Sequence, residues 1–159
     1  MNKEFIIIAP HADDEIIGCW ELLQAEKVRA VAFASSDAME GAKASSIRFG
    51  FPILHIDELG YDSPGVIYMF PDHTYELHPL HRKLGAIGEN LLRSGKCEVW
   101  FYTTNMNTPY IHTLSGDSTH NLKLFALNQA YPNKKSLWEY DHKYFLFEGY
   151  TKWIMKWND

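Results

Sequence analysis

Short apolar segments alternate along this chain with longer segments in which apolar residues recur at helical spacing. The short segments lie at 5–9, 28–34, 52–56 and 99–102, and they have the length of strands buried on both faces of a parallel sheet. Helical spacing covers about 16–27, 39–49, 77–93 and 119–130. The alternation predicts βαβ units with helices on both faces of the sheet. We therefore expect an α/β fold, a Rossmann-like three-layer sandwich with a mostly parallel sheet.

Other parts of the chain have a less regular pattern. Residues 60–79 are rich in turn formers and aromatic residues, which indicates a loop or a short hairpin beside the site. Residues 103–118 are predicted to form a polar loop, and Tyr144–Phe147 a strand. The length of 159 residues fits one domain, so we expect residues 1–159 to form a single domain.

Charge and cysteine content narrow the class of protein. Fifteen Lys and Arg against twenty Asp and Glu give a net charge of −5, which argues against a nucleic-acid partner. The basic pair Lys134–Lys135 is interpreted as solvated surface. Cys19 and Cys97 form neither a disulfide framework nor a CxxC pair, and no apolar run is long enough to cross a bilayer. These features predict a soluble cytoplasmic protein without membrane insertion.

Candidate chemistry gathers where the first strand ends, at residues 10–15, PHADDE. Ligands of parallel α/β sheets bind at the carboxyl ends of the strands. His11 and Asp14 are three residues apart, so a first helical turn can direct both at one point. Imidazole nitrogen and carboxylate oxygen suit Zn²⁺, and a catalytic zinc needs three protein ligands and an open position for water. The alternative is an acidic helix N-terminus that only favours the helix dipole, with His11 on the surface.

The PHADDE sequence resembles the (A/P)HPDDE signature of the LmbE-like, PIG-L-type de-N-acetylases, with Ala12 in place of the usual proline. The order of elements over about residues 5–130 is also similar to that family. The resemblance implies an LmbE-like fold, zinc ligation by His11 and Asp14, and Asp13 as the general base.

The resemblance also implies a third zinc ligand, the last histidine of an HxDH motif. The matching residues are 117–120, so His120 is the candidate. Asp117 and Thr119 replace the first histidine and the aspartate of that motif. Asp117 is therefore a candidate for the acid that protonates the leaving amine, or for a carboxylate that orients His120. His112, earlier in the same loop, is the alternative third ligand.

Three further histidines, His73, His78 and His81, crowd the junction between a loop and a helix. No acidic pair like the one beside His11 adjoins them, and we do not assign them to the site.

The implied activity is that of a metal-dependent deacetylase, which hydrolyses a C–N bond other than a peptide bond. Its substrate would be a small N-acetylated sugar or sugar conjugate, similar to N-acetylglucosamine. Two alternatives stay open: a metal- or sugar-binding protein of the same fold without turnover, and a metal hydrolase acting on another amide. A dinucleotide enzyme is disfavoured because no GxGxxG follows the first strand.

Overall fold

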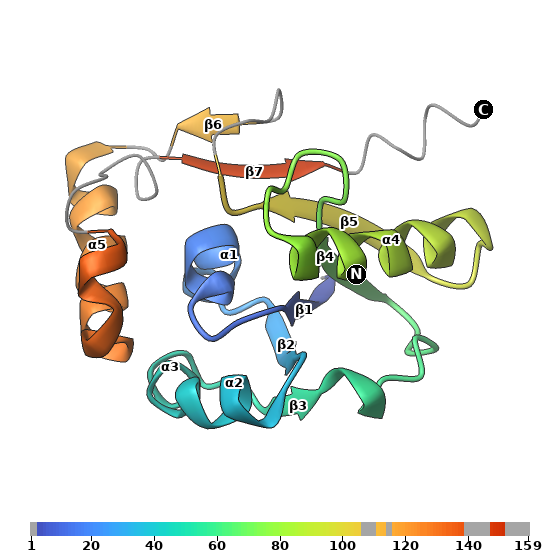
Figure 1. Ribbon diagram of the computed structural model, residues 1–159, viewed down its shortest axis with the longest axis horizontal. Helices are drawn as coiled ribbons and strands as arrows, with labels where there is room; N and C mark the ends of the chain where they lie inside the picture. Colours follow the sequence, from blue (N-terminus) through green and yellow to red (C-terminus); the bar gives the residue numbers. More distant parts are fainter. Residues whose placement is uncertain (1–2, 106–110, 114–115, 139–146, 152–159) are drawn as a thin grey trace.

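A mixed sheet forms the centre of the molecule. The computed structural model describes residues 3–105, 111–113, 116–138 and 147–151, without the side chains of 111–113, 116–121, 136–137 and 147–151. The strands are β1 Glu4–Ala9, β2 Val28–Phe33, β3 Ile53–His55, β4 Val66–Pro71, β5 Glu98–Thr103, β6 Ile111–Thr113 and β7 Phe147–Thr151. Their order across the sheet is β3-β2-β1-β4-β5-β7-β6 (Figure 1).

The first five strands are parallel, and the last two are antiparallel additions at one edge. β1 pairs with β2 and β4, β2 with β3, and β4 with β5, all in parallel. β7 runs antiparallel to β5, and β6 antiparallel to β7. The expected α/β fold with a mostly parallel sheet is confirmed.

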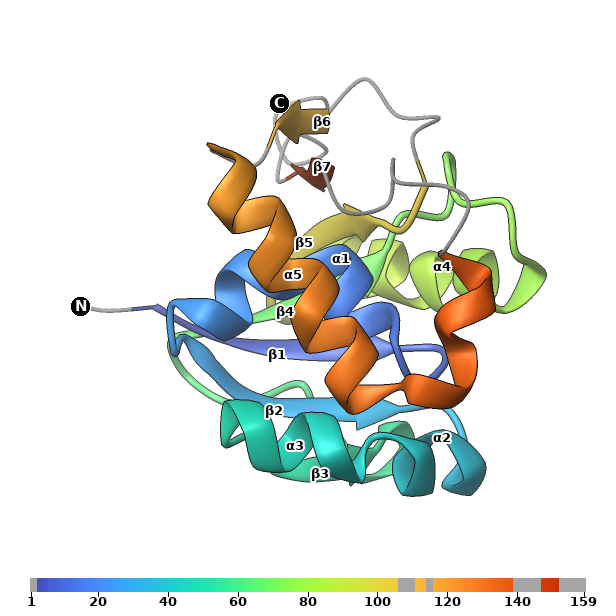
Figure 2. The same cartoon turned by 90° about the vertical axis from the view of Figure 1, so that its left-hand side faces the viewer.

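Helices cover both faces of this sheet. They are α1 Asp14–Gln24, α2 Ser36–Gly41, α3 Lys43–Phe49, α4 Pro79–Arg93 and α5 Gly116–Ala130, with the 3₁₀ helices η1 Ile56–Glu58 and η2 Pro132–Leu137. Figures 1 and 2 show α4 on one face, α1, α2 and α3 on the other, and α5 outside α1 and α3.

Two apolar clusters hold the layers together, and alternate residues of β1 belong to each. Ile7 is buried in the cluster beneath α1, whereas Ile6 and Ile8 are buried in the cluster beneath α4. A central parallel strand must be apolar on both faces for this reason, which explains the unbroken run at 5–9.

Several expectations for the irregular segments were wrong. Residues 60–79 contain the buried strand β4, which lies between β1 and β5, in place of the expected loop or hairpin. The loop 103–118 contains β6, whose partner β7 comes much later in the chain and leaves no local signal. The helix expected at 39–49 is two helices that meet at Ala42, after a glycine that disfavours helix. The strand expected at Tyr144–Phe147 lies outside the described residues up to 146, and β7 begins at Phe147.

The described helices include none that is long and apolar enough to span a membrane.

The strand order reverses between β1 and β4. From β1 the chain proceeds outward through β2 and β3, then returns to place β4 on the other side of β1. At such a reversal the connections after the two strands diverge and leave a crevice at their carboxyl ends, where ligands bind in open α/β sheets. The β1–α1 and β4–α4 connections meet there.

Candidate functional site

The β1–α1 connection is a tight turn that brings His11 and Asp14 together. Pro10 ends the strand, and Asp13 adopts φ 112° and ψ −28°, in the left-handed region that non-glycine residues rarely occupy. The main-chain N–H of Asp13 donates to Glu15 Oε2 at 3.0 Å, which helps to hold this conformation. Because of the turn, the His11 main-chain N–H donates to Asp14 Oδ2 at 2.8 Å. Such backbone strain is often found at functional sites.

The β4–α4 connection places His81 opposite this turn. His78 caps α4, since its Nδ1 accepts from the Leu80 N–H at 3.1 Å, and Pro79 occupies the first helical turn. One turn later His81 is buried, with 4% of its surface exposed. Gly85 allows α4 to lie close to the end of β4, because a Cβ there would be 2.4 Å from the Pro71 carbonyl oxygen.

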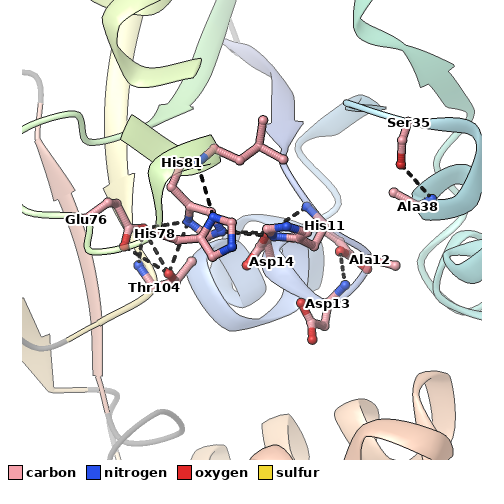
Figure 3. Close-up of polar contacts among 12 residues, drawn as sticks. His11, Ala12, Asp13, Asp14, Ser35, Ala38, Glu76, His78, His81 and Thr104 are labelled. Carbon is pink, nitrogen blue, oxygen red and sulfur yellow. Dashed lines mark hydrogen bonds and ion pairs between the residues drawn. The ribbon is translucent and has the colours of Figure 1, made fainter. Parts of the chain in front are cut away.

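Three ligand atoms from these two connections converge. His11 Nδ1 lies 3.2 Å from Asp14 Oδ2 and 3.2 Å from His81 Nε2. His81 Nε2 lies 3.1 Å from Asp14 Oδ2, which closes a nearly equilateral triangle. Figure 3 shows the three side chains pointing toward one another, two from the β1–α1 turn and one from α4. We call His11, Asp14 and His81 the donor triangle.

His78 borders the donor triangle. The ring centroids of His78 and His11 are 4.7 Å apart, and those of His78 and His81 are 5.3 Å apart. One ring nitrogen from each of His11, His78 and His81 lies within 4.8 Å of the other two, so these three histidines could also hold a metal ion.

The second ring nitrogen of His81 faces a buried carboxylate. His81 Nδ1 is 3.3 Å from Glu76 Oε1, and Glu76 is 3% exposed. Residues after β5 fix that carboxylate. The Thr104 N–H donates to it at 2.7 Å and the Thr104 hydroxyl at 2.9 Å (Figure 3). Asn105 Nδ2 donates to its other oxygen at 2.7 Å. Glu76 therefore determines which ring nitrogen of His81 points toward Asp14.

The donor triangle opens into a cavity of about 490 Å³, which Asp13 also lines. In Figure 3 the Asp13 carboxylate lies apart from the three ligand atoms. It contacts Lys134 of η2 instead, with 3.3 Å between Lys134 Nζ and Asp13 Oδ2. Lys134 also donates to the Ala12 carbonyl oxygen, so η2 is tied directly to the β1–α1 turn.

Burial and neighbouring charges shift the pKa values of the titratable groups of the site, some upward and some downward. Burial, with the charge of Asp14, raises the pKa of the Asp13 carboxyl to about 7, against the opposing effect of Lys134. Burial would also raise the pKa of Asp14, but hydrogen bonds with His11 and His81 outweigh it and lower that pKa. Burial would lower the pKa of His81, whereas its hydrogen bonds with Asp14 and Glu76 raise it to about 10. The lowered pKa keeps the Asp14 carboxylate ionised.

The structure brings together three of the residues singled out from the sequence. His11 and Asp14 meet as expected, and Asp13 lines the same cavity. The backbone of His112 lies in β6 and that of Asp117 and His120 in α5, but their side chains lie outside the described residues. The roles expected of these three residues stay predictions.

Four residues that the sequence reasoning did not assign also belong to the site: His78, His81, Glu76 and Lys134. The expectation that Lys134 is merely solvated surface was wrong, because it contacts Asp13. The sequence contains a signal for His78, His81 and Glu76. Residues 66–70 are apolar and Pro71 follows them, just as Pro10 follows the run 5–9.

Comparison with known proteins supports the fold. No family model and no curated protein matches this chain. Among solved structures, the chain is similar to the conserved protein TT1542 from Thermus thermophilus, with a TM-score of 0.57 and 14% sequence identity over 94% of each chain. At this identity the likeness establishes the α/β fold alone.

Proposed function

We propose that this protein is a zinc-dependent hydrolase that removes an N-acetyl group from an N-acetylglucosamine-like substrate, with the donor triangle as its zinc ligands. The resemblance of PHADDE to the de-N-acetylase signature supports the reaction class, and the order of the parallel strands and helices agrees with it. Support for the metal comes from the geometry of the site.

The observation that carries the proposal is the size of the donor triangle. In a tetrahedral zinc site with Zn–N and Zn–O distances of about 2.0–2.1 Å, neighbouring ligand atoms are about 3.3–3.4 Å apart. The three distances between His11 Nδ1, Asp14 Oδ2 and His81 Nε2 are 3.2, 3.1 and 3.2 Å. Three ligand atoms at this spacing match one face of such a tetrahedron and leave the fourth position for water or substrate.

The donor set and its surroundings also fit zinc. Two imidazole nitrogens and one carboxylate oxygen form a common catalytic zinc set. Histidine ligands of metals usually donate their other ring N–H to a carboxylate or a carbonyl. Glu76 stands in that position behind His81, at 3.3 Å from Nδ1.

Asp13 is the proposed general base. Zinc, when bound, would lower the pKa of a water molecule and polarise the acyl carbonyl. Asp13 takes a proton from water as the water oxygen bonds to the carbonyl carbon and the C=O electron pair moves to the carbonyl oxygen. The C–N bond then breaks as the amine nitrogen takes a proton from Asp13 or from an acid such as Asp117, and the acetic acid that is left ionises to acetate by releasing its proton to solvent. Asp13 lines the cavity without joining the donor triangle, as this role requires.

The third ligand has two candidates on different elements. His81 occupies the third corner of the donor triangle, and it is the ligand proposed here. His120 remains the residue that the family motif implies, so variants of both histidines must be compared.

Metal content and amine release test the proposal together. Purified protein is expected to carry about one zinc per chain, and a His11→Ala, Asp14→Ala double variant to carry almost none. The zinc-loaded protein is expected to release amine from a panel of N-acetylated sugars that includes N-acetylglucosamine. Equal zinc content in wild type and double variant would refute the metal site. Zinc binding without amine release from any member of the panel would refute the deacetylase activity and indicate a metal-binding protein that does not hydrolyse these sugars.

A further inference from the structure

Lys134 places a positive charge inside the cavity, beside the proposed base. Its ammonium group reaches the β1–α1 turn from η2 and donates hydrogen bonds to the Ala12 carbonyl oxygen and to Asp13 Oδ2. About one third of the Lys134 side chain is exposed, and this residue lines the cavity. Among the described residues that line it, Lys134 is the sole lysine or arginine.

The ammonium group has more donors than the described residues use. A lysine carries three N–H groups. Two acceptors face Lys134 Nζ within the described part of the chain, Ala12 and Asp13, which leaves one N–H for a group that enters the cavity.

The reaction creates such a group. When water adds to an acyl carbonyl, negative charge develops on the carbonyl oxygen, and the released acid carries a carboxylate. The site itself is rich in carboxylates, since Asp13, Asp14 and Glu76 all line the cavity. An anionic oxygen entering there is repelled by those groups unless cations offset them.

We propose that Lys134 binds the anionic oxygen of the acyl group, both as the oxyanion forms and in the released carboxylate. This inference rests on the hydrolytic function proposed above. Lys134 is then a catalytic residue, since it contacts the reacting oxygen.

Acetate, the carboxylate that deacetylation releases, is the probe. Its binding is measured by calorimetry on zinc-loaded and on metal-free protein, for wild type, Lys134→Met, Lys134→Arg and Lys135→Met. Lys135 is adjacent to Lys134 in η2 and is absent from the residues that line the cavity, so Lys135→Met removes the same charge outside it. We expect wild type and Lys135→Met to bind acetate with similar millimolar dissociation constants. Lys134→Met should weaken binding by roughly tenfold to a hundredfold, the range for a hydrogen bond to a charged group, and Lys134→Arg should restore most of it.

Zinc content and thermal stability, measured on the same samples, separate the possible failures. The inference is overturned if wild type binds no acetate at millimolar concentrations, or if Lys134→Met binds it as well as wild type. It is also overturned if Lys134→Met and Lys134→Arg lose zinc and stability together, because Lys134 would then only hold the turn. Failure of wild type to retain zinc would contradict the proposed function instead, and the metal-free titration would still report on Lys134.

Discussion

Replacing His81 by alanine should sharply reduce the affinity for zinc. Four-ligand zinc sites in small peptides bind with about 10–16 kcal/mol, or about 2.5–4 kcal/mol per protein ligand. Since about 1.4 kcal/mol corresponds to a factor of ten, loss of one ligand should weaken binding by roughly two to three orders of magnitude. His81 is buried and 3.1 Å from Asp14, so its removal also leaves a gap beside that carboxylate.

The assay is competition for zinc with a chromogenic chelator, performed on His81→Ala, His81→Gln and His120→Ala. The glutamine variant keeps most of the side-chain volume, so it separates loss of a ligand from loss of packing. Circular dichroism before and after zinc addition verifies that each variant is folded. The reasoning is refuted if both His81 variants bind zinc like wild type while His120→Ala loses it, which is the pattern that the family motif implies.

Three further predictions concern the surroundings of the donor triangle. Glu76→Gln should weaken zinc binding by about 10–100-fold, the usual effect of removing a carboxylate behind a histidine ligand, and an unchanged affinity in the chelator assay would contradict its role. Asp13→Asn should keep zinc and lower amine release by roughly 10²-fold or more, whereas loss of zinc with normal turnover of the remaining holoenzyme would make Asp13 a ligand. Gly18→Ala should cost about 1–3 kcal/mol of folding stability in a denaturant titration, because the new Cβ would lie 2.3 Å from the Tyr102 ring. That ring is fixed by a 2.7 Å hydrogen bond from its hydroxyl to the Ile8 carbonyl, so a stability equal to wild type would show that it can move after all.

The half of the site that depends on local sequence could be predicted. His11 and Asp14 are three residues apart at the end of an unbroken apolar run, and a single turn brings them together. The apolar pattern located four of the five parallel strands, because a strand buried on both faces has a continuous apolar sequence.

The rest of the site depends on the order of the strands in the sheet, which the local pattern of apolar residues does not reveal. The apolar run 66–70 lies among turn-forming residues, and nothing in it indicates that β4 pairs with β1 and brings the β4–α4 connection to the site. His81 and Glu76 were missed for that reason. Lys134 was missed because it contacts Asp13 across 121 positions of the chain, and no spacing rule links residues so far apart.

Diffraction from crystals of the zinc-loaded protein, measured at the zinc absorption edge, tests the central claim most directly. We expect one strong anomalous peak about 2.0–2.2 Å from His11 Nδ1, Asp14 Oδ2 and His81 Nε2, with Glu76 still paired to the other ring nitrogen of His81. A peak bound by His11 and Asp14 with His120 in place of His81, or no peak at the carboxyl ends of β1 and β4, would contradict it.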